Sequence, residues 1–383
     1  NSLLFQTGRE GNSALDWFDA PDPRPDYYRR LPSYAENPDV AAQIAALLKS
    51  DENAHQINWQ ELYNINDASY GTVENANGIS GNNVSGKISK YLISERRTDQ
   101  TVLSLNSTFS YELSSVAKLS AGVLARSFKG KNFQTALDLL GGDFIVDNDK
   151  YAERDFPNDS LALQNDLDVL NKIVKEGEQY GYNYNTHIRS AQPWAQLDIT
   201  LRKFDIFAAA NVGFTNIWRE GLVRNGRFPD NSKGNSEKQK FTTYGIKAGT
   251  TYKLNGRNYL YANAGYMTQA PLVRDIFQSP RTRNTTIPNL TTEKTLSAEA
   301  GYILRAPVLK ARVSAYYTQF RDLARTTSFY HDELRTFVNF NLNGIGRTHI
   351  GTEIGLDYKI SPSFSVQAAA NLGDYYYDTR AYA

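Results

Sequence analysis

The 383-residue sequence predicts an all-β protein, an antiparallel transmembrane β-barrel of which about 11 strands are present. Two observations predict it: long stretches of alternating apolar and polar residues, and tight turns that alternate along the chain with long loops. Strands of soluble domains run to about 5–6 residues, whereas these stretches alternate for roughly 11–13, close to the 9–11 that a tilted strand needs to cross a bilayer. A soluble β-sandwich is the alternative fold.

The composition is compatible with this fold and excludes several others. Lys and Arg number 42 against 41 Asp and Glu, a net charge of +1, so we expect no nucleic-acid partner. A mean hydropathy of -0.53 excludes transmembrane helices, but it does not exclude a barrel, whose alternating strands average to a polar score. The chain has no cysteine, which excludes a disulfide framework and thiol chemistry.

The clearest hairpin runs from Thr242 to Met267, with its predicted tip at Asn255-Gly256. Apolar and aromatic side chains share one face of each arm: Tyr244, Ile246, Ala248, Thr250, Tyr252 and Leu254, then Leu260, Ala262, Ala264 and Tyr266. Asn-Gly supplies the positive φ angles of a two-residue type I′ turn, so we expect that turn here.

One strand fragment at the start of the chain and four further hairpins repeat the pattern. Their turns are expected at Ser114 to Ala117, Arg202-Lys203, Ala306-Pro307 and Ser361-Pro362. The links between hairpins are long, at about 8–92, 130–192, 221–240, 271–294 and 323–347. Outer-membrane barrels place short turns on the periplasmic side and long loops outside the cell, and the sequence predicts that arrangement.

Aromatic residues gather near both ends of the predicted strands. Those near a short turn are Tyr111, Phe204, Tyr252, Tyr259, Tyr302, Tyr358 and Phe364, and those toward the other end are Phe241, Tyr244, Phe214, Tyr266 and Tyr317. Tyr244 and Tyr252 would stand roughly 20 Å apart, near the ~25 Å height of an apolar barrel band. The sequence therefore predicts two aromatic girdles.

The opposite strand face is polar and would line the lumen of a barrel. Its charged residues have both signs: Asp198, Arg202, Lys247, Lys253, Glu299, Arg305, Lys310, Arg312, Glu353, Asp357 and Lys359. Such a surface either is solvated in a wide interior or holds a plug by salt bridges and hydrogen bonds.

Two loop stretches predict short helices, "NPDVAAQIAALLKS" and "DSLALQNDLDVLNKIVKEGE". No stretch predicts an enzyme, a cofactor or a metal site. The four histidines, His55, His187, His331 and His349, are scattered without metal-ligand spacing. Asp147 and Asp149 lack the Gly and terminal Glu of a calcium loop, so a solvated acidic loop is expected.

The long loops are rich in aromatic and arginine residues, which are enriched in recognition surfaces. The candidate ligand- or partner-binding residues are Trp17, Tyr27, Tyr28, Arg29, Arg224, Arg227, Arg274 and Arg281. Packing of the loops on one another needs the same side chains and is the alternative explanation.

Several loop stretches resemble a known family: "SALDWFDAPDPRPDYYRRLPSY", "TALDLLGGDF", "YGYNYNTH", "WREGLVRNGRFPDNSKGNSEKQKF" and "NLTTEKTLSAEAGY". They resemble the barrel region of TonB-dependent outer-membrane receptors of the Bacteroidetes type, in the subgroup with an N-terminal carboxypeptidase-regulatory-like domain. The resemblance implies a 22-stranded barrel in the outer membrane, surrounded by its lipid and filled by a plug, which imports a scarce ligand with energy from TonB.

We therefore expect residues 1–383 to form part of one barrel domain, with the plug domain, and hence contact with TonB, outside this chain. The ligand stays open among siderophore, glycan, peptide and cobalamin. The alternative function is a structural or partner-binding barrel subunit of a larger surface complex, for example with a surface lipoprotein, and a plain porin is a third.

Overall fold

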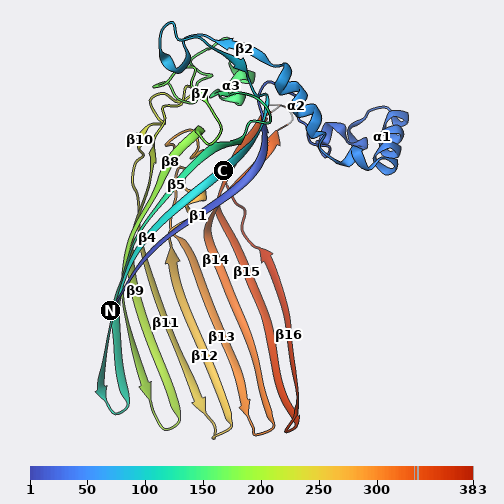
Figure 1. Cartoon of the computed structure of the whole chain (residues 1–383). Coiled ribbons are helices and arrows are strands. Elements are labelled where there is room, and N and C mark those ends of the chain that lie inside the picture. Colours follow the sequence, from blue (N-terminus) through green and yellow to red (C-terminus); the bar gives the residue numbers. More distant parts are fainter. Residues whose placement is uncertain (332, 334–335, 383) are drawn as a thin grey trace.

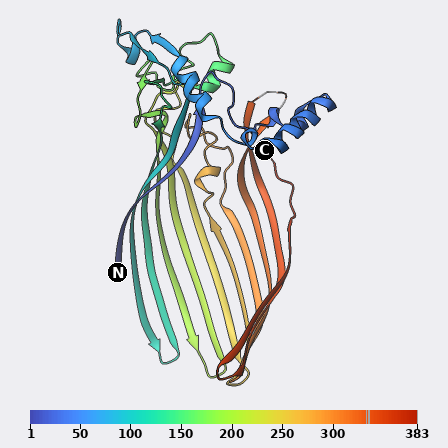
Figure 2. The same ribbon diagram turned by 45° about the vertical axis from the view of Figure 1, so that its right-hand side comes forward.

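The computed structural model of the chain describes residues 1–331, 333 and 336–382. In this part of the chain, eleven long strands form one antiparallel sheet that curves like the wall of an open barrel (Figures 1 and 2). In sheet order, which is also chain order, they are β1 (Ser2–Trp17), β4 (Tyr91–Ser114), β5 (Ala117–Asp138), β8 (Gln179–Thr200), β9 (Phe204–Gly221), β11 (Gln239–Lys253), β12 (Asn258–Gln269), β13 (Glu293–Arg305), β14 (Leu309–His331), β15 (Thr336–Ser361) and β16 (Phe364–Tyr377). A short strand, β10 (Gly234–Asn235), pairs with β9.

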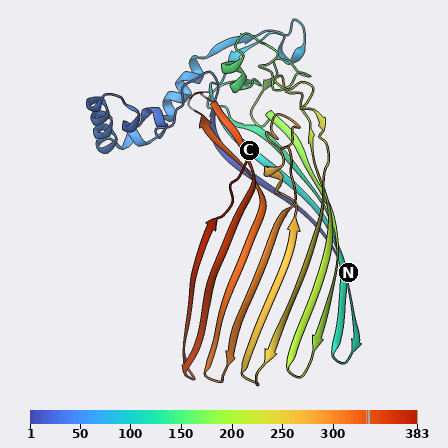
Figure 3. The ribbon, with the colours of Figure 1, turned by 180° about the vertical axis from the view of Figure 1, so that it is seen from behind.

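The five short turns predicted from the sequence lie at one end of the sheet, and the long loops lie at the other, where β14 and β15 also meet (Figure 3). The loop end carries the smaller elements: η1 (Tyr28–Arg30), η2 (Pro32–Tyr34), α1 (Pro38–Ser50), η3 (Glu52–His55), α2 (Trp59–Ala68), β2 (Tyr70–Val73), η4 (Ala76–Gly78), β3 (Val84–Lys87), β6 (Ile145–Val146), α3 (Lys150–Asp155), β7 (Ile173–Val174) and η5 (Val273–Asp275). Among the described residues, no helix is both long and apolar enough to span a membrane.

The strand register confirms the predicted alternation. Ala248 lies opposite Ala264, and Ala264 lies opposite Ala298, so the small apolar residues of three strands form one row on one face. Large apolar side chains on this outer face are exposed, with Phe109 and Ile246 each 61% accessible. A soluble sandwich would bury such a face, whereas a lipid-facing wall leaves it open.

The strands are longer than the sequence predicts, so the loop boundaries expected at 8–92, 130–192 and 323–347 are wrong. The connections are 18–90, 139–178, 222–238 and 270–292, and β14 and β15 together occupy 323–331 and 336–347. Beyond the apolar band the outer face of a strand meets water, while its inner face packs against the loops through both polar and apolar side chains, so the apolar alternation ends. The backbone groups there still need partners, and the ladder of hydrogen bonds continues.

The predicted helix over residues 38–50 is confirmed as α1, whereas the helix expected over 159–178 is wrong. Asp159 accepts hydrogen bonds from the backbone of Leu161 and Ala162, but turns and the short strand β7 follow in place of a helix. Asn171 and Gly177 have positive φ angles of 49° and 82°, which an α-helix does not accept. Backbone groups of this segment bond instead to other loops, as between the Leu167 amide and the Arg224 carbonyl oxygen, 2.7 Å apart.

The tip of the clearest hairpin differs from the predicted type I′ turn. Neither Asn255 nor Gly256 has a positive φ, and the tip is a four-residue loop over 254–257. The Asn255 side-chain oxygen accepts hydrogen bonds from the backbone N–H groups of Arg257 and Asn258, at 2.9 and 3.1 Å. An Asx turn therefore replaces the tighter turn.

Aromatic rings gather at two levels on the outer face. Phe204 and Tyr252 lie near the short turns with ring centroids 4.8 Å apart, and Tyr244 and Tyr266 lie higher, 5.8 Å apart. Phe241 was expected in the upper girdle but points inward, because it is an odd step from Tyr244 along the strand. It is 7% exposed and packs with Ile217, Ile276 and Phe277.

The buried core lies at the loop end, on the inner side of the curve. The loop after β12 enters this space (Figure 2), and two further apolar clusters anchor the loops that follow β1 and β5. Lower down, the inner face is polar and its charges pair across strands. Arg312 lies 2.6 Å from Glu299, and Lys253 lies 2.6 Å from Asp205. The wall thus has an apolar outside and a polar inside.

Candidate functional site

A pocket of about 120 Å³ lies at the loop end, where three loops fold against the inner face of the wall. It is lined by Asp16, Phe18, Arg96, Gln134, Asn148, Asp149, Lys150, Tyr151, Asn165, Tyr180, Gly181, Tyr182, Asn225, Arg227, Arg281 and Thr282. A larger hollow of about 630 Å³ lies near mid-strand over Ala195, Ala208 and Ala248, and its accessible lining is apolar. The loop-end pocket is the candidate because many charged and aromatic recognition groups converge on it, whereas the larger hollow has one of each, Lys247 and Tyr266.

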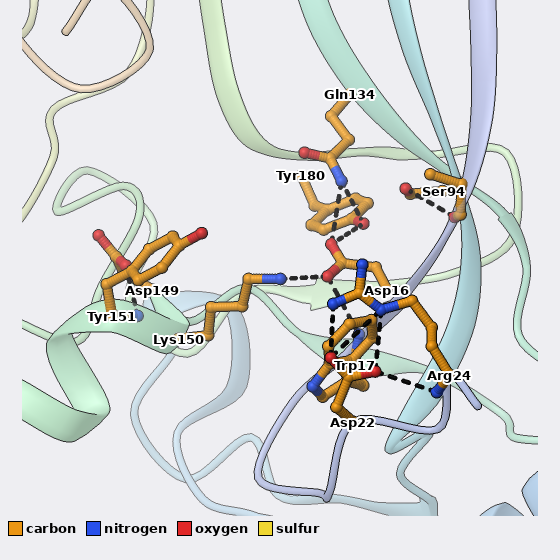
Figure 4. Close-up of polar contacts among 11 residues, drawn as sticks. Asp16, Trp17, Asp22, Arg24, Ser94, Gln134, Asp149, Lys150, Tyr151 and Tyr180 are labelled. Carbon is orange, nitrogen blue, oxygen red and sulfur yellow. Dashed lines mark hydrogen bonds and ion pairs between the residues drawn. The ribbon is translucent and has the colours of Figure 1, made fainter. Parts of the chain in front are cut away.

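Asp16 forms the floor of this pocket (Figure 4). Its carboxylate, on a residue only 5% exposed, accepts hydrogen bonds from Lys150 Nζ, from the Tyr180 hydroxyl at 3.2 Å and from Gln134 Nε2 at 3.2 Å. Gln134 also donates to the Tyr180 hydroxyl at 2.6 Å. A buried charge persists only with such partners, so this network fixes side chains of β1, β5 and β8 to one another and to the loop carrying Lys150.

The pocket carries more positive than negative charge. Four basic side chains, Arg96, Lys150, Arg227 and Arg281, face two carboxylates, Asp16 and Asp149, a net charge of +2. Arg227 pairs with Asp149 at 2.6 Å and Lys150 pairs with Asp16. Arg96 and Arg281 have no carboxylate within ion-pair distance in the described part of the chain, so two guanidinium groups are free to bind an anion.

Arg281 is held in place by an aromatic ring. Its guanidinium carbon lies 4.9 Å from the centroid of Tyr182, a cation–π distance. Stacking of this kind fixes the plane of the guanidinium group while it leaves the N–H edges available. The next arginine along this loop, Arg283, lies over Phe228, and burial followed by the charge of Arg227 lowers its pKa below the ordinary value.

Two polar atoms of the lining are buried without a hydrogen-bond partner. They are Asn148 Oδ1, an acceptor, and Arg227 Nε, a donor. Buried polar atoms in folded proteins are nearly always paired, and an unpaired one costs about 1–3 kcal/mol. A bound ligand that offers both a donor and an acceptor would satisfy them.

The structure brings together only some of the residues predicted from the sequence. Arg227 and Arg281 both line the pocket. Trp17 ends β1 beside it, with Lys150 Nζ 5.3 Å and the Arg24 guanidinium 5.2 Å from its ring centroid. Trp17 therefore supports the lysine that reaches the pocket floor.

Tyr27, Tyr28 and Arg29 form a separate cluster on the first loop. The Tyr28 ring lies 5.0 Å from Tyr27 and 6.1 Å from Tyr330 at the end of β14, and Arg29 Nε donates to the Tyr28 hydroxyl at 2.9 Å. These residues link the first loop to the opposite side of the sheet. They do not line the pocket.

Arg224 and Arg274 also lie outside the pocket. Arg224 pairs with Asp168 at 3.0 Å, and Lys233 pairs with the same carboxylate at 2.6 Å, which ties two loops together. The Lys233 hydrogen bond, helped by Arg224, holds the pKa of Asp168 below its ordinary value. Arg274 is 80% exposed and contacts only its neighbour Asp275 among carboxylates of the described residues.

Sequence reasoning missed the wall residues of the pocket, namely Asp16, Gln134, Tyr180 and Tyr182. They fell within the segments predicted as loops, so no strand face was assigned to them. The motif YGYNY carried a usable signal, because tyrosines at every second position are typical of one face of a strand.

The comparison that decides the family is with a family model described as TonB dependent receptor-like, beta-barrel, which matches residues 4–383. The chain belongs to the TonB-dependent receptor β-barrel family. Members of this family are outer-membrane receptors and transporters, not enzymes. No curated protein matches the chain.

Solved structures of metal transporters share this fold at low sequence identity. The copper transporter OprC superposes with a TM-score of 0.52 at 12% identity, covering 74% of this chain and 39% of that one. The FrpB iron transporter from Neisseria meningitidis (F3-3 variant) superposes with a TM-score of 0.50 at 10% identity, covering 80% and 42%. At such identity the likeness shows the fold alone, and the chain spans about two fifths of the length of these transporters.

Proposed function

We propose that this chain is part of an outer-membrane TonB-dependent transporter that binds a scarce, negatively charged nutrient at its loop end and imports it through the barrel. Energy would come from TonB through a plug domain, as the family implies. The observation that carries the proposal is the loop-end pocket, with a net charge of +2, two unpaired guanidinium groups and two buried polar atoms without partners.

The position of the pocket supports uptake from outside the cell. It lies at the end of the wall opposite the short turns, on the inner face, where a solute would enter the lumen. Arg96 and Arg281 provide charge-assisted hydrogen bonds for carboxylate, phosphate or catecholate oxygens, and Tyr182 adds a flat contact surface. The resemblance of the loops to the Bacteroidetes type supports the same assignment.

The test uses the full-length protein in cells and after purification. The Arg281→Ala variant should weaken binding and uptake of the transported anion about tenfold or more, since a hydrogen bond to a charged group contributes roughly 1.5–3 kcal/mol. The probes are ferric complexes of citrate and of a catecholate chelator, with a neutral hydroxamate complex for comparison.

Arg274→Ala is the matched control, because it removes an arginine from the same loop at an 80% exposed side chain outside the pocket. Equal losses in both variants, or a loss confined to the neutral complex, would contradict the proposal.

A second candidate function is that of a partner-binding subunit, favoured by the first loop. The loop over 18–90 projects beyond the wall and carries α1, none of whose residues is buried (Figures 1 and 3). Leu47 and Trp59 on this loop are 54% and 45% exposed. Photo-crosslinking from these two positions in cells should yield one defined surface protein if this function holds. Cross-linking no stronger than from Val308 at the short-turn end would count against it.

A further inference from the structure

A group of unpaired basic side chains lies on the outer face of the wall, above the upper aromatic girdle. We call this group the outer basic patch, and it consists of Lys129, Lys131, Arg189, Lys238 and Lys240. Lys129 and Lys131 lie on β5, Arg189 on β8, Lys240 on β11 and Lys238 directly before β11, on the side away from the loop-end pocket. Neither ligand binding at the pocket nor passage through the lumen uses it.

The strand register places these residues on the lipid-facing side. Phe214 of the upper girdle lies opposite Thr242 and Ala191. Two residues farther toward the loops, Asn216 lies opposite both Arg189 and Lys240. Even steps along a strand keep the same face, so these cations point outward like Phe214.

A second row lies two residues higher. Trp218 lies opposite His187, and His187 lies opposite Lys129. At about 3.3 Å per residue the two rows stand roughly 7 and 13 Å along the tilted strand from Phe214. Polar headgroup regions add roughly 5–8 Å on each side of the ~30 Å hydrocarbon core, so these two rows fall at headgroup depth. Lys131, opposite Asn185, lies two residues higher still.

None of the five cations has a carboxylate within ion-pair distance among the residues that the structure describes. Two acidic side chains lie near them, and both have other partners. Asp99, directly opposite Lys131, pairs with Arg97 at 2.9 Å and Arg9 at 3.7 Å, and Glu220 accepts a hydrogen bond from Asn185 at 2.8 Å and pairs with His187 at 2.9 Å. Like charges gathered on adjacent strands repel one another unless anions neutralise them. The patch therefore presents a surface that needs an anionic counterpart.

Trp218 lies at the centre of the outer basic patch, and three neighbouring side chains pack on its ring. Its ring stacks on His187 with centroids 4.7 Å apart and planes within 6°, while Arg189 and Lys238 lie 5.3 and 5.1 Å from its centroid. Trp218 is 7% exposed, so these side chains cover it. Two cations are thereby held on one aromatic ring, a preorganised arrangement that loose surface lysines lack.

We propose that the outer basic patch binds the phosphate groups of anionic lipids in the outer leaflet. Phosphate matches the unpaired guanidinium and ammonium groups, and basic side chains at headgroup depth attract anionic lipids. The counterpart is a lipid because the patch adjoins the apolar outer face, where a soluble protein would have to enter the headgroup layer. This inference rests on the proposed membrane location and is independent of transport.

The test measures lipid retention by the purified full-length protein. The probes are bis-phosphorylated lipid A and its dephosphorylated form, added to the protein in neutral detergent and counted by native mass spectrometry. The Arg189→Gln/Lys238→Gln variant should lower the apparent affinity for phosphorylated lipid A about tenfold or more and leave the dephosphorylated form unaffected. Raised salt should weaken binding to the wild type.

The matched control is Arg202→Gln/Lys203→Gln, which removes two cations from the opposite end of the β8–β9 hairpin and should change the affinity less than about twofold. Heat-resistant migration on gels checks that each variant folds, and Lys240→Gln alone gives a milder change if the double variant does not. Equal loss in patch and control variants, equal retention of both lipids, or displacement of lipid by millimolar inorganic phosphate would overturn the proposal.

Membrane placement is measured separately with a spin label at Ala248, whose relaxation by dissolved oxygen reports contact with lipid. If that label is buried in lipid and lipid A is still not retained, the proposal that the outer basic patch binds lipid is wrong, while the proposed membrane location stands. If the label is exposed to water, the proposed location fails with it.

Discussion

On the inner face, a glycine on one strand leaves room for a tyrosine ring from the neighbouring strand, as Gly301 does for Tyr261. A Cβ atom on Gly301 would lie 2.5 Å from the Val313 carbonyl oxygen and 2.6 Å from the Tyr261 ring. The Tyr261 hydroxyl bonds to Glu299 and accepts from Arg312 at 2.7 Å. The absence of a side chain at Gly301 thus lets a tyrosine lie flat on the wall and complete a charged network.

We expect Gly301→Ala to lower the free energy of unfolding by about 1–3 kcal/mol, because the ring and the backbone oxygen leave no room for the methyl group. Urea unfolding of the full-length protein in lipid vesicles measures it. Gly355→Ala is the control, since nothing lies within 4 Å of the Cβ position there. Equal destabilisation by both changes would show that backbone flexibility, not the tyrosine contact, matters.

A second prediction at this scale concerns Asp168, which joins two loops through Arg224 and Lys233. Its pKa is lowered from 3.8 by the Lys233 hydrogen bond and by the neighbouring charges. A carboxyl group with a lowered pKa in the folded state stabilises it above the ordinary pKa and loses that effect as the pH falls through the lowered value. The contribution is small because the pair is exposed and screened.

Hydrogen exchange over residues 222–238 should be faster in Asp168→Asn than in the wild type at neutral pH. After correction for intrinsic rates, the difference should vanish as the pH falls below 3.8, the ordinary pKa of this carboxyl group. Asp230→Asn, in the same loop, should show no difference at either pH. A difference that persists in acid would mean that the aspartate acts through packing and not through its charge.

At the scale of the element, strand length determines the height of the wall. β15 has 26 residues, about 85 Å of chain at 3.3 Å per residue, whereas 9–11 residues cross a bilayer. The outward side chains of β4 change accordingly from Leu105 and Phe109 to Arg97 and Asp99, which pair at 2.9 Å. The upper half of each long strand therefore stands above the apolar band and forms the walls that hold the loops.

Within the apolar band, the free-energy cost of introducing a charge depends on which face of the strand carries it. Ala298→Arg should lower the free energy of unfolding by roughly 2–4 kcal/mol, because Ala298 lies in the outer row with Ala264 and the arginine would face lipid. Ser297→Arg, one step away on the inner face, should cost much less. Urea titration in phosphatidylcholine vesicles compares them, and equal costs would contradict the assignment of the two faces.

At the scale of the whole molecule, the two faces and the two ends of the wall differ in surface chemistry. The outer face is apolar, the inner face below the loops is polar, and the loop end carries the pocket and the projecting first loop. Spin labels at Ala248, Ala298 and Ala368 should be relaxed by oxygen dissolved in the bilayer. Labels at Gln196, Ser297 and Gln367 should respond to a water-soluble relaxer, and the reverse pattern would indicate a soluble protein with an apolar core.

The sequence by itself determined the hairpins, their order and the two faces of the wall. Alternation is a local property, so residues such as Ile246, Ala248 and Thr250 show which side is apolar without knowledge of their neighbours. It also indicated which end carries the loops and predicted α1, whose Pro38 and Asn37 cap are read from adjacent residues. These features depend on short-range backbone geometry and on the solvent that each face meets.

Only the tertiary structure decided where the strands end and which loop residues meet. Above the apolar band the ladder is held by neighbouring backbones, so Gln134 and Tyr180 belong to strands although no apolar pattern marks them. Arg227 and Arg281 share a pocket while Arg224 and Arg274 do not, because loop positions are set by contacts between segments far apart in the chain. These four arginines cannot be distinguished from the sequence. Burial, ion pairing and ring stacking distinguish them only after the loops have folded on the wall.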